Sequence, residues 1–504
     1  MYSRKKKVLK NTTSSLVFEV TTIICGFVLP KMILKSFGSE INGLVTSITQ
    51  FLGVISFLEL GVGSVIQSAL YKPLAEKNEN EISKIVVSGQ KFFSKLAKLL
   101  VIYVIILILV YPFIANQDFG FLYTGTMIIV LSISSFAQYY FGITNLLLLS
   151  ADQKGYISYN IQTLTLILNT VACFVLIQIG ASIHIVKLIT SLIYGIRPLA
   201  LSLYVKKHYN INWHIQYEEE PIKQKWNGVA QHISAVVLNG TDNIVLTVFS
   251  DLKDVSIYSV YNLVTSGVRT LLLSLTKGLQ ALIGELWAKQ ETEKLQKVFG
   301  TMEWILHTVT VWVFGITLSL IIPFIEVYTH GIADVNYVRP LFAILIVVAN
   351  AGYCLRLPYS IMILAAGHYK QTQNNYICAT VINIVISILT VKIWGLVGVA
   401  IGTLLAMFYQ TVWMAAYSSK HLLKRSYDIF IKQLIVDVVT IVLVKIVTEN
   451  KMFKLTNFTY TSWILLAIKT TLVGGAVVIF ANLVFYRQYI YQIINKMKVL
   501  KRKC

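Results

Sequence analysis

Long apolar runs, separated by short polar connections, occupy almost the whole chain. Each run is near-continuously apolar and far longer than a barrel strand, so the pattern predicts membrane-spanning helices. About 14 spans fit, at 13–36, 41–70, 94–116, 121–149, 156–180, 183–205, 227–250, 255–285, 302–328, 336–365, 372–393, 395–417, 431–448 and 461–486. The fold class expected is therefore an all-α integral membrane protein.

Composition supports this interpretation and excludes others. Of the 504 residues, 56% are hydrophobic and only 13% are charged, so a soluble enzyme and a disordered chain are excluded. The net charge of +21 would suggest nucleic acid in a soluble protein. Here the Lys and Arg residues concentrate in alternate loops when both termini are placed in the cytoplasm, as the positive-inside rule requires. We expect a multi-pass membrane protein with both termini in the cytoplasm and no nucleic-acid partner.

The longest polar stretch lies near the middle of the chain and predicts a division into two lobes. We expect an N-terminal lobe at 1–208, a cytoplasmic linker at 209–226 and a C-terminal lobe at 227–422. Residues 423–504 would add spans 13 and 14 and a basic cytoplasmic tail.

An internal repeat relates the two lobes. Pro112-Phe113-Ile114 lies over Pro323-Phe324-Ile325, and Gly180 and Tyr194 lie over Gly395 and Tyr409, always at an offset near 211–216 residues. A six-span unit repeated in one orientation predicts two pseudo-symmetric six-helix lobes, with transport by rocking of one lobe against the other.

Ionisable residues inside the predicted spans are the candidate functional residues, because a charge at that depth is costly and usually faces a cavity or a partner. The candidate cations are Arg269, Arg356, Arg197, Lys277 and Lys31. The candidate carboxylates are Glu19, Glu59 and Asp242.

Each candidate also has a structural interpretation. Lys31 and Lys277 can snorkel to an interface, and Glu19 and Asp242 can tie helices together. Arg269 and Arg356 lie well inside apolar runs, where a guanidinium needs an anionic partner. A cavity with several cations suits a phosphate-bearing lipid. The carboxylates are candidates for holding a coupling H⁺ or Na⁺, or for neutralising the arginines.

Other chemistry is not indicated by the sequence. We find no phosphate-binding Gly-Lys loop, no zinc-type His-Glu-x-x-His motif and no cysteine pair with metal or redox spacing. The sequence therefore predicts no catalytic residue, no metal, no cofactor other than a coupling ion, and no enzymatic activity.

Several motifs together resemble the Wzx-type polysaccharide-unit flippases of bacteria, in the multidrug/oligosaccharidyl-lipid/polysaccharide exporter superfamily. They are FGSEINGL at 37–44, LELGVG at 58–63, LYKPLAE at 70–76, SADQK at 150–154, TDNI at 241–244 and IYSVY at 257–261. The resemblance covers at least spans 1–12.

The resemblance implies a 14-helix, two-lobed flippase of the bacterial cytoplasmic (inner) membrane. Its substrate would be an undecaprenyl-pyrophosphate-linked oligosaccharide, later polymerised into capsule, O-antigen or exopolysaccharide. Membrane lipids, a polysaccharide polymerase and chain-length machinery are the implied partners. The alternatives are a multidrug/cation antiporter of the same superfamily, a peptidoglycan lipid-precursor flippase and, from another class, a membrane enzyme such as a polysaccharide polymerase.

Overall fold

The computed structural model describes residues 2–115, 119–218, 229–276 and 279–490. Within these ranges the secondary structure is helical and contains no strand. Ten helices or helix pairs are long and apolar enough to cross a membrane. The predicted all-α, multi-pass class is therefore confirmed. Lys277, residues 219–226 of the predicted linker and the basic tail lie outside the described residues.

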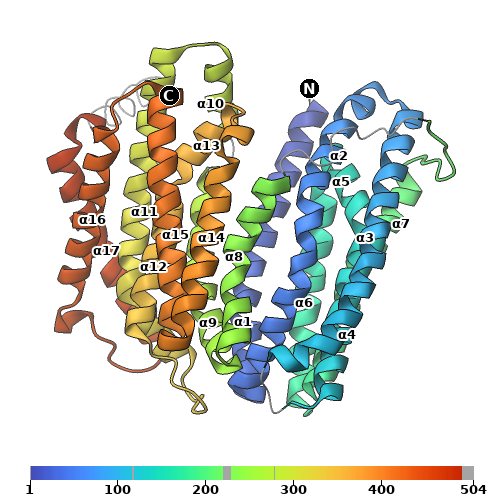
Figure 1. The fold of residues 1–504 in the computed structure, drawn as a ribbon, viewed down its shortest axis with the longest axis horizontal. Helices are drawn as coiled ribbons and strands as arrows, with labels where there is room; N and C mark the ends of the chain where they lie inside the picture. The colour runs from blue at the N-terminus through green and yellow to red at the C-terminus, as the bar shows by residue number, and fades with distance from the viewer. Residues whose placement is uncertain (1, 116–118, 219–228, 277–278, 491–504) are drawn as a thin grey trace. The chain divides into compact units, whose positions relative to one another are not determined.

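The chain forms two compact units, Met1–Ser256 and Ile257–Cys504, each an elongated helical bundle (Figure 1). The first contains α1 (Tyr2–Gly53), η1 (Val54–Ser56), α2 (Phe57–Glu76), α3 (Glu79–Ile114), α4 (Phe121–Ala137), η2 (Gln138–Gly142), α5 (Ile143–Ala151), α6 (Gly155–Gln178), α7 (Ile183–His208) and α8 (Val229–Phe249). The second contains most of α9 (Leu252–Leu275), then α10 (Leu279–Ala288), α11 (Thr292–Tyr328), α12 (Pro340–Leu355), α13 (Leu357–Ala365), α14 (Tyr369–Trp394), α15 (Leu396–Tyr417), η3 (Ser418–Leu423), α16 (Asp428–Thr448), η4 (Lys451–Phe453) and α17 (Tyr460–Phe485).

Each predicted span falls on helical structure, with three local differences. The first span and the start of the second form one long helix, α1, which bends at Gly38. The φ of Gly38 is 81°, a value that glycine adopts readily. The second span is interrupted by η1, and the eighth is divided between α9 and α10. The charged residues of α16, among them Lys432 and Asp437, keep it out of the ten most apolar spans.

The backbone repeats the pattern found in the sequence. Left-handed residues end equivalent helices at Lys77 and Gln290, at Gln153 and Gly367, and at Gly180 and Gly395, which are 213, 214 and 215 residues apart. The interruption of α4–α5 by η2 also recurs, as the break between α12 and α13. Both lobes of the repeat therefore carry a helix break at the same place.

Small residues allow the closest helix contacts. Gly398 and Gly402 form a Gly-x-x-x-Gly pair where α15 packs against α14. A Cβ atom on Gly402 would lie 2.2 Å from Ser387 Oγ and 2.9 Å from the Asn383 carbonyl oxygen. Without a strong hydrophobic drive between helices in lipid, such close packing is a principal source of their association.

We expect Gly402→Ala to lower the free energy of unfolding by about 1–3 kcal/mol, because the methyl group must push α14 and α15 apart. Gly267→Ala in α9 is the matched control, since no atom lies within 4 Å of its added Cβ. An SDS unfolding titration followed by circular dichroism measures both. Equal stability of the two variants would contradict the packing argument.

One end of the first unit is held by a polar cluster around Asp152, in the turn between α5 and α6. Its carboxylate accepts hydrogen bonds from Tyr209 Oη at 2.6 Å and from Lys7 at 3.2 Å, and it pairs with Lys154 at 2.7 Å. Burial alone raises the pKa of the Asp152 carboxyl. The hydrogen bonds from Lys154 and Tyr209 and the charges of Lys154 and Lys7 outweigh burial, so this pKa is lowered. The cluster joins the start of α1, the α5–α6 turn and the end of α7.

A lowered pKa means that the ionised Asp152 stabilises the fold above the usual carboxyl pKa, and that this contribution is lost as pH falls through the lowered value. Asp152→Asn should cost about 1 kcal/mol at pH 7 and little near pH 2. Melting temperatures at the two pH values, with the exposed Asp428→Asn as control, test this. The same loss at both pH values would refute the ionic contribution.

Candidate functional site

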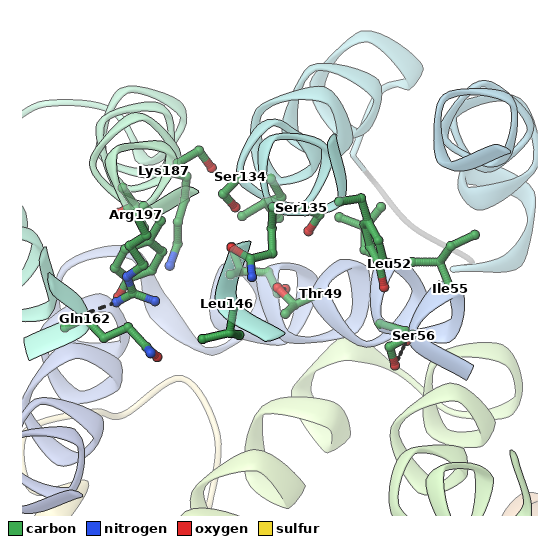
Figure 2. Close-up of a pocket in the computed structure, with 18 of the residues that line it drawn as sticks. Thr49, Leu52, Ile55, Ser56, Ser134, Ser135, Leu146, Gln162, Lys187 and Arg197 are labelled. Carbon is green, nitrogen blue, oxygen red and sulfur yellow. Dashed lines mark hydrogen bonds between the residues drawn. The ribbon is translucent and has the colours of Figure 1, made fainter. Parts of the chain in front are cut away.

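A cavity of about 540 Å³ lies within the first unit, among α1, α4, η2, α6 and α7 (Figure 2). One face of α7 forms its basic wall, with Lys187, Thr190, Ser191, Tyr194 and Arg197 at helical spacing. The facing elements contribute hydroxyl and amide groups from Thr49, Ser56, Ser134, Ser135, Gln138, Tyr139, Ser158 and Gln162. The lining therefore combines these polar groups with apolar side chains, namely Val45, Leu52, Ile55, Leu131, Leu146 and Leu201.

Two cations face this cavity, and none of the described residues that line it is a carboxylate. Arg197 is held in place: its Nε donates to Thr165 Oγ1 at 2.6 Å, and its guanidinium carbon lies 4.0 Å from the centroid of the Tyr194 ring. Lys187 makes no hydrogen bond or ion pair with any residue that the structure describes. Both side chains point from α7 into the space in front of Ser134 and Ser135 (Figure 2).

A second cationic group lies in the second unit, at the break between α12 and α13. Arg356 is 6% exposed, and among the described residues its Nε and Nη1 find no hydrogen-bond acceptor. Its guanidinium carbon lies 4.4 Å from the centroid of the Tyr353 ring, and that of Arg269 in α9 lies 4.9 Å from the same centroid. The structure thus brings the two strongest sequence candidates together on one aromatic ring.

The other predicted residues are more scattered. Glu19 and Lys31 are half-buried on α1, and Asp242 is buried on α8, but none of the three lines the cavity. The side chain of Glu59 and all of Lys277 lie outside the described residues. The roles assigned to these residues from the sequence remain predictions.

Lys187 was not among the residues predicted from the sequence. Its signal was present as a polar stripe on an otherwise apolar span, because Lys187, Thr190, Ser191, Tyr194 and Arg197 follow the i, i+3, i+4, i+7, i+10 spacing. Lys187 lies four residues from the start of the predicted span 183–205, so its position alone does not distinguish it from a lysine at the membrane interface.

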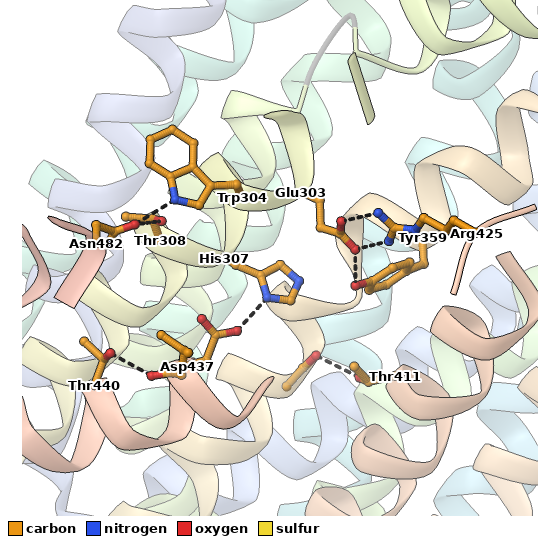
Figure 3. A network of polar contacts seen from close by, with 12 residues as sticks. Glu303, Trp304, His307, Thr308, Tyr359, Thr411, Arg425, Asp437, Thr440 and Asn482 are labelled. Carbon is orange, nitrogen blue, oxygen red and sulfur yellow. Dashed lines mark hydrogen bonds and ion pairs between the residues drawn. The ribbon is translucent and has the colours of Figure 1, made fainter. Parts of the chain in front are cut away.

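A fourth arginine, in the connection between η3 and α16, has a different role. Arg425 follows η3 and makes a two-pronged ion pair with Glu303 of α11, with Nη1 2.6 Å from Oε2 and Nη2 bonded to Oε1 (Figure 3). Tyr359 of α13 donates to the same carboxylate at 2.5 Å. The two side chains neutralise each other's charge. We therefore interpret this ion pair as a structural contact between α11 and the segment after η3.

The two cationic groups share a chemistry. A buried guanidinium with unpaired N–H groups, and a cavity with Lys and Arg but no carboxylate, both favour a bound anion with several oxygen atoms, such as a phosphate. The hydroxyls and amides around Lys187 and Arg197 can in addition bind the hydroxyls of a sugar. A cationic ligand would be repelled.

No protein-family model and no curated protein sequence matches the chain. Solved structures do share its fold. The inward closed conformation of the lipid II flippase MurJ superposes with a TM-score of 0.70 at 15% identity, covering 94% of this chain and 100% of that chain. An inward-facing multidrug resistance MATE family transporter of the MOP superfamily gives 0.58 at 14% identity, covering 80% and 94%. The eukaryotic MATE transporter AtDTX14 gives 0.57 at 12% identity, covering 82% and 95%. The chain is therefore similar in fold to membrane transporters of this type.

We expect Arg356→Met and Arg425→Met to differ in their effect on stability. Removing an arginine without a carboxylate partner should leave the free energy of unfolding unchanged or raise it, whereas removing Arg425 leaves Glu303 buried and unpaired at a cost of about 3–5 kcal/mol. SDS unfolding titrations compare the two. A similar large loss in both would show that Arg356 also has a structural partner.

Proposed function

We propose that the protein is a membrane transporter that moves an undecaprenyl-pyrophosphate-linked oligosaccharide across the bacterial cytoplasmic membrane by alternating access, for capsule, O-antigen or exopolysaccharide synthesis. The observation that carries the proposal is the cavity of the first unit, with Lys187 and Arg197 on one wall and no carboxylate among the lining residues that the structure describes.

The pyrophosphate is the part of such a substrate that most needs a protein partner. It carries negative charge and several oxygen acceptors, and both must leave water to enter a membrane-embedded path. An arginine held by Thr165 and Tyr194 is preorganised for phosphate oxygens, and a nearby flexible ammonium adds a second charge. In the second unit, Arg356 and Arg269 form a second pair of cations suited to phosphate oxygens.

The cavity also suits the carbohydrate. Its volume of about 540 Å³ falls in the range of small-molecule sites, and its serine, threonine and amide side chains are neutral donors and acceptors. The fold that the chain shares with a lipid II flippase supports a lipid-linked substrate. Both termini would then lie in the cytoplasm, and a polymerase with its chain-length machinery would use the product.

Two other functions fit this fold. A peptidoglycan lipid precursor also carries pyrophosphate and sugar, and the similarity to MurJ favours it as the second candidate. A multidrug/cation antiporter would have the fold of the MATE transporters. The charge of the cavity argues against that third function, because two unneutralised cations repel a cationic drug.

The proposal predicts that Lys187→Gln and Arg197→Gln each slow lipid transport at least tenfold, because a charge-assisted contact to phosphate is worth about 1.5–3 kcal/mol. Full-length protein in proteoliposomes would be given a polyprenyl-pyrophosphate-linked oligosaccharide. The fraction that reaches the opposite leaflet would be measured with an impermeant lectin or glycosidase. Lys294→Gln, at an exposed site, is the matched control.

Parallel assays separate the candidates. Transport of a polyprenyl-pyrophosphate oligosaccharide, with weak competition from a peptidoglycan precursor, supports the proposed substrate, and the reverse preference supports the second candidate. Transport of a cationic dye without either lipid would overturn the proposal in favour of the antiporter.

A further inference from the structure

The face of α11 that contacts α16 and α17 carries several polar groups, among them Trp304, His307 and Thr308 (Figure 3). Trp304 Nε1 and Thr308 Oγ1 both donate to Asn482 Oδ1 in α17, at 2.7 and 3.2 Å. Further along, the hydroxyls of Ser319 and Thr448 are 2.7 Å apart. Most of these contacts join neutral groups, and helix association in lipid is enough to explain them.

One contact in this interface is titratable. His307 Nδ1 lies 2.6 Å from Asp437 Oδ2, and the two side chains are 1% and 7% exposed. His307 is the sixteenth of the 37 residues of α11, and Asp437 is the tenth of the 21 residues of α16. The pair therefore lies near the middle of both helices, far from either end.

The imidazole of His307 can accept one more proton. With Asp437 ionised, Nδ1 carries the hydrogen that the carboxylate accepts, which leaves Nε2 as the position that gains or loses a proton. Nε2 is buried and makes no hydrogen bond in the part of the chain that the structure describes.

The surrounding charges favour that proton. On α11 the nearest charged group is Glu303, which Arg425 neutralises. The tyrosines that face the pair are Tyr359 of α13 and Tyr486 at the end of α17, and both are neutral. With a neutral imidazole the cluster has a net charge of −1 in a buried site, and one added proton makes it neutral.

We infer that His307 and Asp437 form a proton-binding site at the α11–α16 interface, and that this proton is the coupling ion of transport. The proton adds to the lone pair of Nε2 and leaves from the same atom. The assignment to the coupling ion rests on the proposed transport function, whereas the binding of the proton does not.

The proton site is tested directly by solid-state NMR of the full-length, ¹⁵N-histidine-labelled protein in lipid bilayers. Among the signals of the eight histidines, we expect the one that is absent from His307→Gln to change from the neutral to the charged form between pH 5 and 9. Asp437→Asn should lower its midpoint by at least one pH unit, a tenfold weaker hold on the proton. Ser319→Ala, which removes a neutral contact between the same two helices, should leave the midpoint unchanged.

A His307 signal that keeps one form throughout this range, or a midpoint that Asp437→Asn does not move, would overturn the proton site. If His307→Gln does not fold, the signal is assigned as the one that shifts in Asp437→Asn but not in Ser319→Ala.

Transport in proteoliposomes tests the coupling. A pH gradient should accelerate lipid transport in the native protein and have no effect in His307→Gln, while transport without a gradient continues. Acceleration that persists in His307→Gln would overturn the coupling role. Titration of His307 together with no transport of any lipid would instead refute the proposed function and leave the proton site standing.

Discussion

The dominant constraint on this protein is the cost of placing a charge among apolar helices. In water a lone arginine is inexpensive, but within a membrane it must find a counter-charge, a hydrogen-bond acceptor or an aromatic face. Arg425 meets this requirement with a counter-charge, through two bonds to Glu303, although its Nε finds no acceptor among the described residues. Arg356 meets it only in part, through the ring of Tyr353. This difference separates an arginine that fastens the fold from one that is available to a ligand.

The internal repeat places the helix breaks that these charges use. The π-helical turn η2 contributes Gln138 and Tyr139 to the cavity of the first unit, and the equivalent break between α12 and α13 positions Arg356 in the second. A break frees backbone polar groups and redirects side chains, so it is where a membrane protein can build a polar site. The two units thus carry cationic groups near matching breaks, although the residues themselves differ.

The two C-terminal helices are bound to the second unit mainly by polar and small residues. Hydrogen bonds from Trp304 and Ser319 flank a small apolar cluster of Val311, Val444 and Val478, and the pair His307–Asp437 lies between them. Neutral hydrogen bonds would suffice to hold helices together in lipid. An ionisable pair in such a place adds a dependence on proton concentration that packing alone does not require.

The sequence by itself determined the membrane class, the positions of the helices and the repeat, and it identified Arg269, Arg356 and Arg197 as candidates. These features are local or periodic, because apolar length, helical spacing and buried charge can be read one segment at a time. Only the tertiary structure decided which charges meet. It showed that Arg425 pairs with a carboxylate. It also showed that Arg269 and Arg356 both lie against the ring of Tyr353. It also paired His307 with Asp437, 130 residues away in the chain, because contacts between distant helices depend on the packing of the whole bundle.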